Sequence, residues 1–129
     1  MNIRLSMASC LIALLAATSV VAQAPGAKRT MLQRTDVGNN MEMVVMIAEI
    51  APGASIGRHT HFGVESGYVL SGSASMEVEG ETPKLVNPGD SFVIGAQKIH
   101  DAKAVGDTPC KVLVTYVVEK GKPLATPAK

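Results

Sequence analysis

Beyond residue 28, the pattern of apolar and polar positions predicts short β-strands and no helix. Residues 41–50 are apolar at nearly every position, residues 110–119 form a second long apolar run, and residues 76–79 alternate apolar and acidic side chains. Turn-forming residues recur at intervals of about 8 to 12 residues, a spacing typical of β-sandwiches and barrels. The sequence therefore predicts a single all-β domain with one core between two sheets.

The run of residues 41–50 predicts a strand that is buried on both faces, because both of its alternating sets of side chains are apolar. Such a strand lies either inside a sandwich or against a second subunit. Met43, Val45 and Ile47 share one face of it. We expect this face to line the interior, where Met41 and Met76 can join it.

The first 22 residues have the features of a signal peptide. Arg4 precedes an apolar run from about Cys10 to Ala22, and small residues end that run where a signal peptidase cleaves. The run is short for a membrane span. We expect cleavage after Ala22 and a periplasmic or secreted protein with no further membrane association; a retained N-terminal anchor is the alternative.

Charge and cysteine content restrict the possible partners. The chain has 12 basic and 11 acidic residues, and cleavage removes Arg4 alone, so the mature chain is close to neutral. With no basic cluster, the sequence argues against nucleic acid as a partner. Cys110 is the one cysteine left after cleavage, which excludes an internal disulfide and favours a small buried side chain over a reactive thiol.

The three histidines suggest a metal site. In a strand His59 and His61 share one face, Glu65 follows four residues later, and His100 lies 35 residues beyond that glutamate. Imidazole and carboxylate ligands suit Fe, Mn, Co, Ni, Cu or Zn, and four protein ligands leave positions open for chemistry. The alternative is that the histidines are ordinary surface residues. Against it, one site would account for every histidine of the chain.

These residues resemble the first motif of the cupins. The glycine, the two histidines, the glutamate and the closing glycine stand at every defining position, and these are Gly53, His59, His61, Glu65 and Gly72. The second cupin motif is retained at Gly89 and His100. Gly95, Gln97 and Ala104 stand where the motif has a proline, a second glycine and an asparagine. The likeness extends over roughly residues 40–118.

This resemblance implies an all-β double-stranded β-helix, a jelly-roll barrel, with the cupin domain at residues 41–118. Residues 23–40 would form a lead-in and first strand, and residues 119–129 a C-terminal tail. By analogy with metal-binding cupins, one divalent transition metal (Fe, Mn, Ni, Cu or Zn) would be held by His59, His61, Glu65 and His100. Single-domain cupins also commonly form homodimers.

The expected function is that of a metal-dependent, dioxygenase-like oxidoreductase acting on a small oxygenated organic molecule. Met43 and Met76 are candidates for the substrate-binding wall. Gln97 can hydrogen-bond a substrate from its turn, or it is simply a solvated turn residue. Glu65 is the candidate catalytic base, if it leaves the metal. A non-catalytic ligand-binding or sensing protein, or a metal-dependent isomerase or lyase, are the alternatives.

Overall fold

The computed structural model describes residues 24–129, so the predicted signal peptide, residues 1–22, lies outside the described part. Every regular element in residues 24–129 is a strand, and no helix there could cross a membrane. The strands are β1 (Ala27–Gly38), β2 (Met41–Ile50), β3 (His59–Thr60), β4 (Gly63–Ser71), β5 (Ser73–Val78), β6 (Lys84–Val86), β7 (Ser91–Ile94), β8 (His100–Val105), β9 (Cys110–Glu119) and β10 (Thr126–Pro127).

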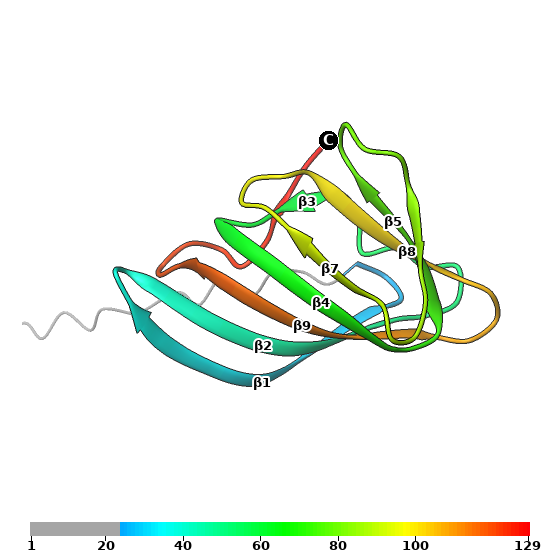
Figure 1. Ribbon diagram of the computed structural model, residues 1–129, viewed down its shortest axis with the longest axis horizontal. Helices are drawn as coiled ribbons and strands as arrows, with labels where there is room; N and C mark the ends of the chain where they lie inside the picture. The colour runs from blue at the N-terminus through cyan, green and yellow to red at the C-terminus, as the bar shows by residue number, and fades with distance from the viewer. Residues whose placement is uncertain (1–23) are drawn as a thin grey trace, which may run out of the picture.

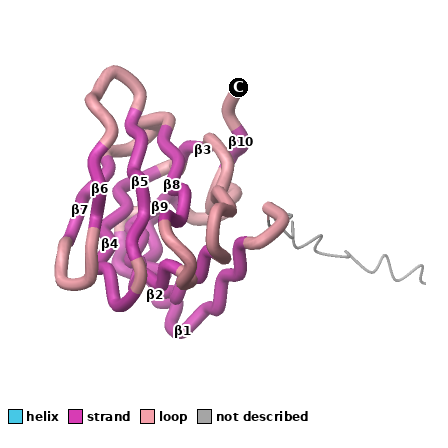
Figure 2. Tube along the Cα trace, turned by 90° about the vertical axis from the view of Figure 1, so that its right-hand side faces the viewer, coloured by secondary structure: helices cyan, strands magenta, loops and turns pink. Residues whose placement is uncertain are grey.

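The strands form two antiparallel five-stranded sheets with one core between them (Figures 1 and 2). One sheet has the order β1-β2-β9-β4-β7 and the other β10-β3-β8-β5-β6. This arrangement agrees with the predicted all-β double-stranded β-helix. The prediction of a barrel was wrong in one respect, because no hydrogen-bonded ladder joins the edge strands of one described sheet to those of the other, so the sheets are not closed.

The core is built by alternation along the three central strands of the first sheet. In β2 the residues Val44, Met46, Ala48 and Ile50 are buried, while the residues between them are half-buried. Each pairs with a buried residue of β9, for example Ile50 with Cys110. Burying an Ile or Val side chain contributes roughly 1.5–3 kcal/mol, so this inner face supplies much of the stability of the fold.

The outer face of the same sheet is also apolar. Met43 of β2 lies on it, and Val64, Tyr68 and Val93 of the neighbouring strands are 42, 48 and 71% exposed. Of the two arrangements expected for residues 41–50, the structure shows a central strand whose inner face alone reaches the core. Homodimer formation stays a prediction.

The C-terminal residues continue the fold. β10 pairs with β3, Thr126 opposite Thr60 and Pro127 opposite His59, and Ala125 is buried. Figure 2 shows β10 at the side of the sandwich beside β3. The segment predicted as a tail therefore extends the sheet that carries the two histidines of the first motif.

Candidate metal centre

The four predicted ligands come together between the two sheets. His59 in β3 pairs directly with His100 in β8, and Glu65 projects from β4 of the opposite sheet. His61 follows β3 immediately and is two residues from His59, so it lies on the same side of the chain as His59. All four side chains are buried, and their ligand atoms lie within 4.8 Å of one another.

Gly63 allows the chain to bring these residues together. It starts β4 beside Val118 of β9, and a Cβ atom at this position would lie 2.0 Å from the carbonyl oxygen of Val117. No side chain fits at that separation. The glycine between the histidine pair and Glu65 is therefore required by the close approach of two backbones.

Hydrogen bonds to the backbone orient each imidazole. The Nδ1 of His59 lies 2.6 Å from the carbonyl oxygen of Gly57, that of His61 2.5 Å from Leu124, and that of His100 2.9 Å from Lys98. A carbonyl oxygen only accepts, so each Nδ1 carries a proton and donates it. In neutral rings this leaves the Nε2 lone pairs available as ligands, which is the usual arrangement of metal-binding histidines.

The contacts of Glu65 leave one buried imidazole nitrogen without a hydrogen-bond partner. Its Oε2 lies 3.0 Å from Nε2 of His100, which donates a hydrogen bond to it when this ring is protonated at both nitrogens, and 2.7 Å from Nε2 of His61. The second contact lacks hydrogen-bond geometry, and Nε2 of His61 is the buried side-chain atom without a partner among residues 24–129. A nitrogen lone pair facing a carboxylate oxygen is unfavourable unless a cation lies between them.

The pKa values of these groups have physical causes in the same contacts. Burial, with a smaller contribution from the neighbouring His100 and His61, lowers the pKa of His59 to about 4, although the hydrogen bond to Gly57 and the carboxylate of Glu65 act in the opposite direction. Burial by itself would raise the pKa of Glu65, but the contacts with His100 and His61 outweigh it, and this pKa falls to about 2. Burial would lower the pKa of His100, but its hydrogen bond to Glu65 raises it instead. Glu65 is therefore a carboxylate at neutral pH.

The residues present fit a divalent transition metal. Three imidazoles and one ionised carboxylate converge, each ring is held by a backbone carbonyl, and an orphaned buried nitrogen faces the carboxylate. Ligands of this type suit Fe, Mn, Ni, Cu or Zn.

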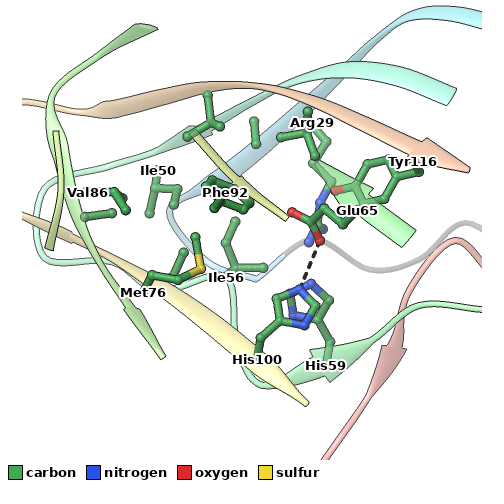
Figure 3. A pocket seen from close by; sticks show the side chains of 15 residues that line it. Arg29, Ile50, Ile56, His59, Glu65, Met76, Val86, Phe92, His100 and Tyr116 are labelled. Atoms are coloured by element: carbon green, nitrogen blue, oxygen red, sulfur yellow. Dashed lines mark hydrogen bonds and ion pairs between the residues drawn. The ribbon is translucent and has the colours of Figure 1, made fainter. Parts of the chain in front are cut away.

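A pocket extends from the centre into the sandwich (Figure 3). At one end lie His59, His100, Glu65, Tyr116 and Arg29. The other end is apolar, and its labelled side chains are Ile50, Ile56, Met76, Val86 and Phe92. The pocket therefore has a polar end that contains the ligands and a wall of hydrocarbon side chains leading away from it.

Of the three predicted substrate-binding residues, only one lies in the pocket. Met76 lines the pocket. Met43 does not, because the inward side chains of β2 are those of Val44, Met46 and their alternates, and Met43 projects from the opposite face. Gln97 is exposed in the turn before β8, where its φ of 61° keeps the left-handed conformation that favours glycine. Its N–H donates to the carbonyl oxygen of His61.

Three residues of the site region were missed in the sequence. Tyr116 of β9 is buried, pairs with Glu65 and packs its ring 4.7 Å from that of His61. Arg29 of β1 reaches the pocket from the edge of the first sheet. Leu124 orients His61 through its carbonyl group. Strand alternation in residues 110–119 could have indicated Tyr116, but nothing in the sequence indicated the other two.

Known proteins with similar folds include several bacterial ones. A conserved protein with a double-stranded β-helix domain from Klebsiella pneumoniae is 22% identical, with a TM-score of 0.66 over 85% of this chain and 90% of that one. KdgF from a Halomonas species is 26% identical, with a TM-score of 0.59 over 71% and 79% of the two chains. DMSP lyase DddQ from Ruegeria pomeroyi is 21% identical, with a TM-score of 0.58 over 67% and 43%.

No protein with a curated description matches the chain. The family model described as the cupin domain matches residues 46–116, which is more than half of the sequence and includes all four candidate ligands. Together with the two facing sheets and the position of the histidines, this match shows that the chain belongs to the cupin family.

Proposed function

We propose that this protein is a metal-dependent oxidoreductase of the dioxygenase-like class, acting on a small oxygenated organic molecule. The observation that carries the proposal is the cluster of four buried ligand side chains, of which His59, Glu65 and His100 line one end of an otherwise apolar pocket. Closed structural metal sites in proteins usually recruit thiolates. Cys110, the free cysteine of the described chain, is fully buried in the core and is not among the ligands.

The residues around such a centre have different roles. His59, His61 and His100 would hold the ion together with Glu65, and a redox-active ion of this kind supplies one-electron and O₂ chemistry when bound. The apolar side chains beyond the ligands exclude water from the substrate. The low pKa of Glu65 makes this carboxylate a good ligand and a weak base, so the role of general base first assigned to it is not favoured.

Tyr116 favours a second candidate, a metal-dependent lyase or isomerase. Burial raises the pKa of its hydroxyl well above the usual range, so this group stays protonated at neutral pH. A phenol that keeps its proton beside the metal ligands can donate a hydrogen bond or a proton to a substrate oxygen. The structurally similar DddQ is named a lyase, and at 21% identity it shares the fold.

Elemental analysis followed by activity measurements tests the proposal. The protein is purified from the compartment in which it accumulates, and its metal content is measured. Oxygen uptake and product formation are then followed with small acids, diketones and flavonols. We expect Fe, Mn, Ni or Cu and substrate-dependent O₂ consumption. Turnover without O₂ consumption favours the lyase or isomerase, whereas a protein that binds ligands and turns over none of them is a binding or sensing module.

Export is part of the proposed function and has its own test. The mature N-terminus is determined by sequencing of protein recovered from the periplasmic and secreted fractions. Cleavage after Ala22 places Gln23 first. A full-length chain retained with the membrane would contradict the proposal.

A further inference from the structure

The pocket contains one cationic side chain that the proposed chemistry does not use. Arg29 stands opposite Ala48 in the β1–β2 ladder, and paired residues project from the same face of a sheet. Ala48 is buried on the inner face, so Arg29 points toward the core, and both residues line the pocket. A guanidinium in apolar surroundings is costly unless charge and hydrogen bonds compensate it.

Tyr116 helps to fix the position of this guanidinium. Arg29 donates a side-chain hydrogen bond to the Tyr116 hydroxyl oxygen, and Tyr116 is 3% exposed. Figure 3 shows the two side chains beside Glu65 at the polar end of the pocket. The planar guanidinium fork matches a carboxylate geometrically, because two parallel N–H groups can donate to its two oxygens.

The charges at this end favour an anion once the proposed metal is bound. Glu65 contributes one negative charge, and the three histidines ligate as neutral rings. A divalent ion therefore leaves the centre with one positive charge, and Arg29 adds a second. In an enclosed pocket of low dielectric, such an excess attracts a single negative charge strongly.

The apolar end of the pocket indicates the chemistry of the part of the ligand that lies beyond its anionic group. Ile50, Ile56, Met76, Val86 and Phe92 offer hydrocarbon alone to whatever lies against them. Phe92 lies across Gly67, where an added Cβ would come within 2.1 Å of its ring. The cavity volume is about 30 Å³, enough for roughly two water molecules, so only the smallest organic ligands fit, and a longer chain or a ring system requires side chains to move.

We propose that the pocket recognises a small aliphatic monocarboxylate. Its carboxylate binds between Arg29 and the metal centre, and its short hydrocarbon tail lies against Met76, Val86 and Phe92. The proposal rests on the proposed metal-dependent function and names the substrate class for the same site. Arg29 is a binding residue in it, positioned by Tyr116.

Calorimetric titration of the metal-loaded protein tests this assignment. The probes are acetate, propionate, butyrate and hexanoate, with propionamide as the uncharged counterpart of propionate. We expect acetate or propionate to bind most tightly, and we expect Arg29→Met to weaken the binding of both by about 10-fold or more. Arg29→Lys should recover part of the loss, and propionamide should bind equally weakly to all three proteins.

Arg34→Met is the matched control. Arg34 lies on the same strand, but its side chain is 49% exposed and pairs with Glu42. This variant should bind propionate as the unchanged protein does. Thermal unfolding of each variant shows that it is folded.

The outcomes separate the inference from the function on which it rests. Equal dissociation constants for propionate in the unchanged protein and in Arg29→Met, with metal retained in both, overturn the role of Arg29. No binding of any carboxylate to the metal-loaded protein overturns the substrate class. A protein that retains no metal at all refutes the proposed function instead, and elemental analysis of the same samples identifies that case.

Discussion

The two ends of the pocket are built on the same strands, and they differ in the kind of side chain that points inward. Along β4 and β9 the inward pairs run from Glu65 and Tyr116 at one end to Val69 and Val112 at the other. The apolar pairs form a core that needs no partner. The polar pair forms a centre in which every charge depends on a neighbour. The apolar end of the pocket is thus stable by burial alone, whereas the stability of the polar end depends on bound metal and on pH.

This difference separates stability from function along the pocket. At the apolar end, free energy comes from burial and is insensitive to pH and metal. At the polar end a buried carboxylate and three imidazoles depend on one another and on a bound cation, so the free energy of this end changes with pH and with metal. Changes at the two ends should therefore be distinguishable by which quantity they alter.

The largest effect should come from removing His61. In His61→Ala one ligand is lost and the remaining three cannot retain the ion, so metal content should fall close to zero and added metal should no longer raise the melting temperature. Elemental analysis and thermal unfolding with and without metal measure both. Thr60→Ala, at the adjacent and only partly buried position, should keep its metal. Full metal content in His61→Ala would contradict the assignment of the site.

The corresponding change at the apolar end is Ile50→Ala. Ile50 is 1% exposed, and truncating it should lower the free energy of unfolding by about 2–5 kcal/mol, because a cavity remains. Denaturant unfolding of the metal-free protein measures the loss. The folded variant should retain its metal, since no ligand has changed. Metal lost in parallel with stability would show that the two ends are not separable.

Acid should destabilise the metal-free protein through the polar end. The folded pKa of His59 is about 4 against an ordinary value of 6.5, so the unfolded chain binds more protons between these values. Stability should fall as the pH drops from 6.5 to 4, by on the order of 3 kcal/mol. Glu65, with a pKa of about 2 against 4.5, adds a further loss below pH 4.5.

The raised pKa of His100 changes stability with pH in the opposite direction. Its contribution is complete below pH 6.5 and is lost as the pH rises through its folded value, so it does not offset the acid loss. Denaturant unfolding at several pH values measures the profile. His59→Gln should remove the component between pH 6.5 and 4, and a flat profile in the unchanged protein over that range would refute the explanation.

The smallest effect should follow from shortening the C-terminus. Removal of residues 124–129 deletes the Leu124 carbonyl that accepts from Nδ1 of His61, and β10 with it. Loss of such an orienting partner typically weakens metal binding about 10- to 100-fold. Competition with a chelator measures the affinity. Removing Ala128 and Lys129 alone keeps Leu124 and should leave it unchanged; equal affinities for the two truncations would exclude the role of Leu124.

The sequence alone was enough to predict which four side chains meet at the candidate metal centre. His59 and His61 are placed on one face by the period of a strand. The apolar pattern predicted the all-β fold, and the first motif together with His100 indicated the family. These features depend only on neighbouring residues or on spacing along the chain. They can therefore be recognised without knowing how the strands are arranged in space.

Only the tertiary structure decided which faces turn inward and which groups meet. Alternation shows that Met43 and Val44 lie on opposite faces of β2, but both are apolar, so pattern alone could not exclude Met43 from the pocket. Arg29 reads as an ordinary polar residue of an edge strand until its pairing with Ala48 directs it inward. Leu124 contributes only a carbonyl group, which every residue has. Side-chain pattern specifies what can be buried; the pairing of distant strands determines what is buried, and beside which partner.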